Sequence, residues 1–274
     1  MFLKRIYGLL IPIFLVPSAI SCSVKESRMS CPCYVNMNVD AFCALNGADD
    51  AMVSVISGSP TQKENITLSE YQGTGYDIVV DRKTNCFSCV VGSEGMKNSG
   101  DSIICPENGE WSRVYADSKS ILCDADDRYV EMVPHKEFCT ITFVLVGLAA
   151  PDGYPYDIRV RAGSNGMRVK DRCPVEGNYT AFAVKSVSGT TYSVRVPRQK
   201  DSEMVMDLLN HSEDRVYTVE DRVKTFPLGL TMKNMGYNWE KEDLEDVYVT
   251  VDYVRASVSV RLDEWSEEYY DEGI

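Results

Sequence analysis

The sequence predicts an all-β protein made of two β-sandwich domains. Two observations support this prediction. Short segments in which apolar and polar residues alternate recur along the chain, and Gly, Pro, Asn and Ser separate them. These segments form two groups, one before and one after Pro134, and only one stretch near the C-terminus has a clear helical period. Many short strands at regular spacing are typical of β-sandwiches.

The first group, in residues 31–133, contains only segments that we expect to be strands. The clearest is 34–40, in which Val35, Met37 and Val39 alternate with two asparagines, so we expect this strand to bury one face. The other strands expected in this half are 52–56, 76–81, 86–91, 102–105, 111–115, 120–123 and 129–133.

The second group begins after Pro134. The segment 138–146 is apolar and β-branched, which predicts a central strand buried on both faces. In 156–162 the apolar residues alternate with Arg159 and Arg161, so we expect the arginines to face outward. The Ser-Asn-Gly sequence at 164–166 is expected to turn the chain. Further strands are expected at 179–187, 192–196 and 203–209.

The C-terminal part carries the helix and the strongest β pattern. Apolar residues from Leu228 to Trp239 are spaced four, three and four apart, which predicts one short helix packed on the core. The segments 247–253 and 256–262 each place valines on one face. Their phases differ by one residue at 254–255, which indicates a bulge or a tight reversal there.

The charge and cysteine content limit the possible functions. The 274-residue chain has a formal net charge of −13. Because phosphate contacts need clustered Lys and Arg, we expect no nucleic-acid partner. The chain has ten cysteines, and nine remain once Cys22 is assigned below. Their pairing cannot be deduced from spacing, and we expect several to be free, buried thiols that pack as small apolar groups.

The N-terminus has the features of an export signal. Lys4 and Arg5 precede an apolar run at 6–20, which is shorter than the roughly 18 residues of a membrane-spanning helix. The sequence Ala-Ile-Ser-Cys that ends at Cys22 resembles a bacterial lipobox. We therefore expect cleavage between Ser21 and Cys22 and acylation of Cys22 with fatty acids such as palmitate. The alternative is an ordinary secretory signal that happens to precede a cysteine.

These features predict the following organisation. Residues 1–21 are a lipoprotein signal peptide and 22–30 a tether, followed by sandwich domains at 31–133 and 134–265 and an acidic tail at 266–274.

No motif indicates an enzyme or a cofactor. The chain has two histidines, His135 and His211, and neither adjoins a nucleophile motif. Cys86 and Cys89 form a C-x-x-C without the second pair that a zinc site needs. The acidic run 124–127 lacks the spacing of a calcium loop, so we read it as a solvated turn. We therefore expect no catalytic residue, no metal and no cofactor.

The order of several segments resembles the fimbrillin-A-associated anchor proteins, which are lipoprotein subunits of Bacteroides-type fimbriae. After the lipobox and a Cys-Pro come Tyr76-Asp77-Ile78-Val79-Val80, the stretch 110–115, His135-Lys136-Glu137-Phe138, Phe226-Pro227-Leu228-Gly229, Asp243-Leu244-Glu245-Asp246 and Val249-Thr250-Val251-Asp252-Tyr253.

The resemblance implies two transthyretin-like β-sandwich domains in tandem. It also implies attachment to the outer membrane through the lipid on Cys22, exposure at the cell surface, and fimbrial subunits as partners, joined by β-strand addition. Cleavage at Arg28 would release the whole body without freeing a strand, so we expect a retained anchor that accepts a strand. The alternative function is a surface lipoprotein that binds glycan in a nutrient-uptake system, with Trp111, Trp239 and Trp265 as the candidate sugar platform.

Overall fold

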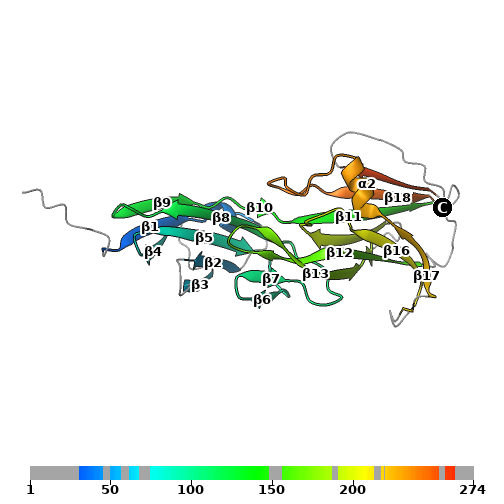
Figure 1. Ribbon diagram of the computed structural model, residues 1–274, viewed down its shortest axis with the longest axis horizontal. Helices are drawn as coiled ribbons and strands as arrows, with labels where there is room; N and C mark the ends of the chain where they lie inside the picture. Colours follow the sequence, from blue (N-terminus) through cyan, green and yellow to red (C-terminus); the bar gives the residue numbers. More distant parts are fainter. Residues whose placement is uncertain are drawn as a thin grey trace, which may run out of the picture.

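The computed structural model describes residues 31–45, 50–56, 62–67, 75–147, 156–186, 191–212, 217–218, 220–252 and 257–262. The predicted signal peptide with Ser21, the lipidated Cys22, the tether with Arg28, and the acidic tail lie outside these residues. The described chain is mostly β, as predicted, and its strands form four sheets (Figure 1). No helix in the described ranges is long and apolar enough to cross a bilayer.

Two of these sheets form what we call the N-terminal sheet pair. Their strand orders are β4-β1-β9 and β10-β8-β5-β2-β3. Side chains from both sheets, including Val35, Ile78 and Phe87, belong to one hydrophobic cluster. The elements up to β10 are β1 Cys33–Asn38, α1 Asp40–Cys43, β2 Asp50–Ile56, β3 Gln62–Thr67, β4 Tyr76–Val80, β5 Thr84–Val91, β6 Lys97–Ser99, β7 Ser102–Ile104, β8 Tyr115–Leu122, β9 Asp127–Glu131 and β10 His135–Lys136.

The other two sheets form the C-terminal sheet pair. Their orders are β14-β15-β11-β18-β19 and β17-β16-β12-β7-β6, with β13 also paired to β12. A second hydrophobic cluster lies between them and includes Ile141, Val160 and Val249. The remaining elements are β11 Phe138–Val146, β12 Tyr156–Arg168, β13 Cys173–Phe182, β14 Val184–Lys185, β15 Thr191–Pro197, β16 Val205–Asn210, β17 Arg222–Phe226, α2 Leu228–Asn234, β18 Val247–Asp252 and β19 Ser257–Leu262.

The two sheet pairs lie end to end along the long axis of the molecule (Figure 1). The strands β6 and β7 precede Pro134 in the chain, yet β7 pairs with β12 of the C-terminal pair. Trp111 and Val114 also belong to the C-terminal hydrophobic cluster. The division of the chain at 133/134 stays a prediction.

The prediction of a turn at 164–166 is wrong, because these residues lie inside the long strand β12. The register with β13 shifts at Ser164 and again at Gly166, which marks an irregularity in the strand. A Cβ on Gly166 would lie 2.4 Å from the carbonyl oxygen of Ile103 in β7. The glycine therefore lets β7 approach the backbone of β12, and glycine in a strand often has this role.

Other differences concern polar or irregular segments. The strands expected at 111–115 and 120–123 are replaced by one strand, β8, while 111–114 is not a strand. The short helix α1 and the polar strands β3 and β17 were not expected. The expected C-terminal helix is present as α2 and ends before Trp239. β18 and β19 pair antiparallel, so the chain reverses between Asp252 and Ser257, while residues 254–255 themselves lie outside the described residues.

Trp111 is completely buried, and its indole Nε1 donates a hydrogen bond to the carbonyl oxygen of Glu137 at 3.0 Å. It therefore cannot serve as an exposed sugar platform. Trp239 packs against the C-terminal hydrophobic cluster and contacts Tyr237 edge-to-face at 4.7 Å between ring centroids. Trp265 lies outside the described residues. The tryptophans of the described chain thus contribute to packing.

We predict that Trp111→Ala lowers the free energy of unfolding by about 3–5 kcal/mol, the usual cost of removing a buried aromatic side chain. Denaturant-induced unfolding of the mature protein measures this change. Trp239→Ala is the matched control and should cost less, because Trp239 is only half-buried. Equal losses for the two variants would contradict this account of the core.

Candidate functional site

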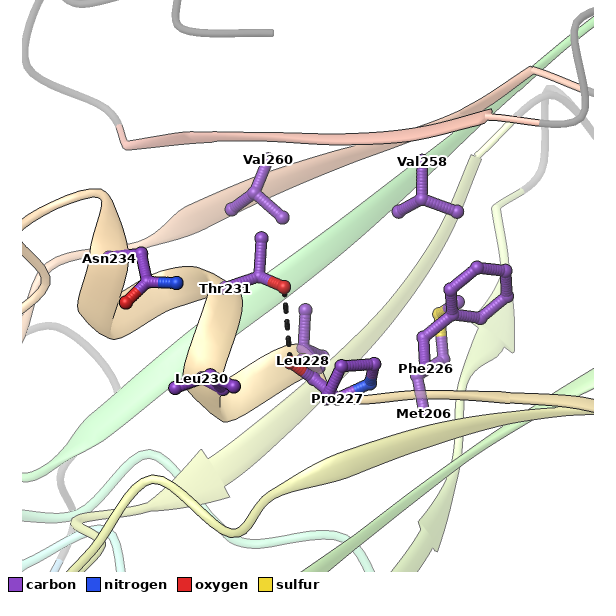
Figure 2. Close-up of a pocket in the computed structure, with 9 residues that line it drawn as sticks. All are labelled: Met206, Phe226, Pro227, Leu228, Leu230, Thr231, Asn234, Val258 and Val260. Carbon is purple, nitrogen blue, oxygen red and sulfur yellow. Dashed lines mark hydrogen bonds between the residues drawn. The ribbon is translucent and has the colours of Figure 1, made fainter. Parts of the chain in front are cut away.

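An apolar groove opens at one side of the C-terminal sheet pair (Figure 2). It lies between α2, the strands β16 and β17 of one sheet, and β19 of the other. Its volume is about 630 Å³ when the part open to solvent is included. The lining residues are Met206, Phe226, Pro227, Leu228, Leu230, Thr231, Asn234, Val258 and Val260. The groove thus offers apolar side chains from both sheets and from the helix.

The strands on either side of the groove are edge strands. Within the described residues, β17 pairs only with β16, and β19 pairs only with β18. An edge strand presents a row of backbone N–H and C=O groups that a further strand can bind. The groove is therefore bordered by two edges that could each accept an extended segment.

The position of α2 depends on a close approach to β16. The N–H of Gly229 donates to the carbonyl oxygen of Met204 at 2.8 Å, and a Cβ on Gly229 would lie 2.6 Å from the carbonyl oxygen of Ser202. Leu228 and Met232 are buried beneath the helix, as the predicted apolar stripe requires. Leu230, by contrast, is 48% exposed at the groove. The helix therefore buries one face and leaves Leu230 exposed at the groove.

The other wall of the groove comes from β19. Val249 lies opposite Val260, and Val251 lies opposite Val258, so the apolar faces of the two antiparallel strands coincide. On β18 and β19, the guanidinium of Arg261 lies 5.2 Å from the centroid of the Tyr248 ring. The alternation seen in the sequence thus directs Val258 and Val260 toward the groove (Figure 2).

A buried carboxylate holds β17 to its sheet. Asp207 of β16 is fully buried and accepts hydrogen bonds from Arg159 (2.9 Å, Nη2) and Arg161 (2.7 Å, Nε) of β12. Thr225 of β17 donates from Oγ1 to the same carboxylate at 2.6 Å. Burial by itself would raise the pKa of Asp207, but the two arginines and Thr225 lower it to about 2. The cluster therefore ties three strands together beside the groove.

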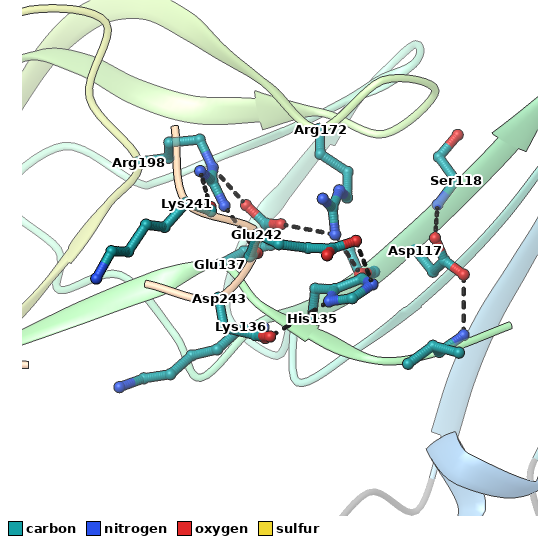
Figure 3. Close-up of polar contacts among 12 residues, drawn as sticks. Asp117, Ser118, His135, Lys136, Glu137, Arg172, Arg198, Lys241, Glu242 and Asp243 are labelled. Atoms are coloured by element: carbon teal, nitrogen blue, oxygen red, sulfur yellow. Dashed lines mark hydrogen bonds and ion pairs between the residues drawn. The ribbon is translucent and has the colours of Figure 1, made fainter. Parts of the chain in front are cut away.

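A second polar cluster lies where the two sheet pairs meet (Figure 3). The backbone N–H of Lys136 in β10 donates to Asp243 Oδ1 at 2.8 Å, and the N–H of Leu244 donates to the carbonyl oxygen of Lys136 at 3.1 Å. His135 Nε2 lies 3.1 Å from Glu242 Oε1. The His-Lys-Glu-Phe and Asp-Leu-Glu-Asp motifs of the sequence therefore contact each other, although more than a hundred residues separate them.

Glu137 is the buried centre of this junction. Arg198 Nε donates to Glu137 Oε2 at 2.9 Å, and Arg172 Nη1 lies 3.5 Å from Oε1. Arg198 also donates to the carbonyl oxygen of Lys241 at 2.7 Å. Burial raises the pKa of Glu137, and the nearby arginines oppose this rise. The junction is thus a packed network rather than a loose linker.

The remaining candidate residues do not form a reactive site in the described chain. His211 lies 3.0 Å from Asp157, a surface contact. Cys86 and Cys89 lie in one strand, β5, and so face opposite sides, as expected from their spacing. Arg82 and Arg128 form ion pairs with Asp126 and Asp124 of the acidic turn. Among the described residues, no group of three His, Cys, Asp or Glu side chains is arranged to hold a metal.

The fold is shared with solved proteins of Bacteroides. A candidate polysaccharide-binding protein from Bacteroides thetaiotaomicron superposes with a TM-score of 0.59 and 11% identity, over 89% of this chain and 100% of the other. A candidate adhesin from the same organism superposes with a TM-score of 0.53 and 13% identity, over 87% of this chain and 97% of the other. The fimbrial anchor protein Mfa2 from Porphyromonas gingivalis superposes with a TM-score of 0.49 and 10% identity, over 87% of this chain and 99% of the other.

No family model and no curated protein matches the sequence. The structural neighbours nonetheless include a fimbrial anchor and candidate adhesins, as the sequence resemblance predicted. At these identities, the neighbours with a TM-score above 0.5 establish a common fold and no more. Those neighbours are described as candidate adhesins and as a candidate polysaccharide-binding protein.

We predict that Asp207→Asn lowers the free energy of unfolding by about 3 kcal/mol at pH 7, because it leaves two arginines facing each other without a counter-charge. The pKa of Asp207 is lowered from about 4 to about 2, so its charge stabilises the fold above pH 4 and this contribution is lost as the pH falls from 4 toward 2. The difference between the two proteins should therefore shrink over that range.

Denaturant unfolding between pH 7 and pH 2.5 measures this effect. Asp171→Asn is the matched control: Asp171 pairs with Arg168 on the surface, so its replacement should cost less than about 1 kcal/mol. A loss at Asp207 that does not depend on pH would contradict the assigned role of the carboxylate.

Proposed function

We propose that the protein is an outer-membrane lipoprotein that anchors a cell-surface fimbria, or forms its base or a minor subunit, and that binds the next subunit by β-strand addition. The observation that supports this proposal is the apolar groove between two edge strands, in a fold shared with candidate adhesins of Bacteroides. The tandem transthyretin-like arrangement of two sandwich domains is part of the same proposal.

The occupant of the groove is an extended segment of another fimbrial subunit. A strand that pairs with β19 or β17 would use their unpaired backbone groups for affinity. Because side chains alternate along a strand, every second residue would point into the groove and contact Leu230, Val258 or Phe226. Side chains on the other face would stay in solvent. The groove therefore fits a donor segment with apolar residues at alternate positions.

Attachment to the membrane depends on Cys22. Each buried methylene group contributes about 0.8 kcal/mol, and one acyl chain gives only marginal binding. Two or three chains on one residue hold a protein at the bilayer durably. The strand β1, which follows the lipidated segment in the sequence, lies in the N-terminal sheet pair, and the groove lies at one side of the C-terminal sheet pair (Figure 1). The body would therefore separate the membrane from the next subunit. A non-enzymatic role accords with this arrangement.

A polar groove supports the second candidate function, glycan binding. It measures about 1050 Å³ with its solvent-open part and is lined mainly by Glu107, Asn108, Arg161, Asn178, Thr180 and Glu203. Planar amide, carboxylate and guanidinium groups are suited to sugar hydroxyls. A protein of the same fold is described as a candidate polysaccharide-binding protein. Loss of glycan binding in Asn178→Ala would favour this function.

We predict that Cys22→Ala yields a soluble protein and detaches the fimbriae from the cells, because alanine has no sulfur to which the lipid can be attached. Cell fractionation and electron microscopy of the mutant cells measure the two effects. Fimbriae that remain on the mutant cells in normal amount would contradict the anchoring role.

We predict that Leu230→Arg weakens binding of the next fimbrial subunit at least tenfold without unfolding the protein, because a charge in the groove would lose its solvation when a donor strand inserts. Mass spectrometry of proteins purified from the original cells in mild detergent identifies the subunit. Hydrogen exchange then shows whether the amides of β17 and β19 become protected in its complex.

Val184→Arg is the matched control. Val184 is 53% exposed on β14, at the opposite edge of the sheet that contains β19, so the change should leave subunit binding intact. Unaltered binding by Leu230→Arg, or protection confined to other strands, would show that the groove does not accept the subunit. Protection of β17 and β19 in the isolated protein would assign the groove to the chain's own terminal residues or to a second copy.

A further inference from the structure

Two buried cysteines come together at one end of the N-terminal sheet pair. Cys33 is the first residue of β1, and Cys123 follows the last residue of β8. Both side chains are fully buried in the N-terminal hydrophobic cluster. β1 and β8 belong to different sheets. The two thiols therefore come from opposite layers of the same core.

Backbone contacts place the two residues side by side independently of their side chains. The N–H of Tyr34 donates to the carbonyl oxygen of Asp126 at 2.8 Å, which brings the start of β1 to the turn after Cys123. Cys33 lies opposite Val80 in β4, and the N–H of Cys123 donates to the carbonyl oxygen of Lys83 at 3.0 Å. Both cysteines thus border the same turn at 81–83.

The two thiols are close enough to influence each other. Burial raises the pKa of the Cys33 thiol, and the neighbouring Cys123 thiol raises it further. The Cys33 sulfur also lies 3.9 Å from the carbonyl oxygen of Tyr34, and the Cys123 sulfur lies 3.8 Å from that of Ile121. Two other buried cysteines have partners elsewhere: Cys105 Sγ donates to the carbonyl oxygen of Gly109 at 3.2 Å, and Cys139 interacts with Tyr237.

We propose that Cys33 and Cys123 form a disulfide that cross-links the two sheets of the N-terminal pair once the chain has been exported. The inference rests on the proposed export, since disulfides persist in oxidising compartments. The oxidant is the disulfide of an envelope thiol oxidoreductase. The two thiols lose two protons and two electrons as the S–S bond forms, and the oxidoreductase disulfide takes them up to become two thiols.

The burial of both thiols determines when the reaction occurs. The thiolate is the nucleophile in thiol–disulfide exchange, and burial disfavours it. The bond therefore forms during folding, before β1 closes over the core, with the turn at 81–83 holding the two segments together. Once formed, it is shielded from reductants by the same burial.

The cross-link would change how the protein carries a load. Tension between the lipid on Cys22 and a fibre bound at the C-terminal groove enters the fold at β1. Without a cross-link, this tension could pull β1 from its sheet and extend the chain that follows. With a Cys33–Cys123 bond the tension passes directly to Cys123, in the turn between β8 and β9, so that residues 34–122 do not carry the load.

Peptide mapping tests the bond directly. The mature protein is isolated from the cell envelope, free thiols are alkylated in denaturant without reductant, and the digest is analysed before and after reduction. We expect a Cys33–Cys123 cross-linked peptide, lighter by two hydrogens than the sum of its parts, while Cys105 and Cys139 are alkylated. Alkylation of both Cys33 and Cys123 would overturn the proposal, and so would a bond from either to another cysteine.

Single-molecule force measurement on the purified mature chain provides a test that does not depend on fimbriae. Oxidised protein held by its two ends should unfold with a contour length roughly 300 Å shorter than reduced protein, because the ~90 residues between the two cysteines stay closed. The double variant Cys33→Ser/Cys123→Ser should show the longer length in both conditions. Equal lengths for oxidised and reduced wild-type protein would refute the cross-link while leaving the anchoring function untouched.

Discussion

The need to satisfy the backbone groups of two sheet edges is the constraint on which the rest of the structure depends. The strands β17 and β19 border the same apolar groove, and each has a single partner in the described chain. Open edges of this kind are usually protected, because they promote uncontrolled pairing between molecules. Here α2 covers part of the groove, and the Asp207 cluster fixes β17 in place. The groove is therefore held open in a defined shape.

The junction between the sheet pairs gives this groove a fixed position relative to the N-terminal sheet pair. Glu137 is buried between Arg198 and Arg172, and β10 is hydrogen-bonded to the segment that leads into β18. Trp111, from the first half of the chain, packs in the second hydrophobic cluster. Buried networks of this type are costly to break once one partner is removed. The arrangement suits a protein that must transmit a load from one end to the other.

Much of the strand pattern could be predicted from the sequence. Alternation places Val35 and Met37 inside, it directs Arg159 and Arg161 outward, and it gives the paired valine faces of β18 and β19. The bounds of β11 agree with the prediction because a continuous apolar, β-branched run leaves little ambiguity. The apolar stripe of α2 was equally clear, since its spacing excludes a strand.

The features that could not be predicted depend on contacts between residues that are far apart in the sequence. Gly166 is typical of a turn in the sequence, but it is needed for the approach of β7. The strands β3 and β17 are polar and depend on their neighbours for pairing, so their own residues carry little signal. The groove could not be predicted because it arises from β16, β17, α2 and β19 together. The proximity of Cys33 and Cys123 has the same origin.

The most direct test of the central claim is a structure of the protein bound to the fimbrial subunit that co-purifies with it, determined by cryo-electron microscopy. The account predicts an extended segment of the subunit in the groove, hydrogen-bonded to β19 or β17, with alternate side chains against Leu230 and Val258. A subunit bound at another face, with the groove empty or filled by this chain's own terminal residues, would contradict it.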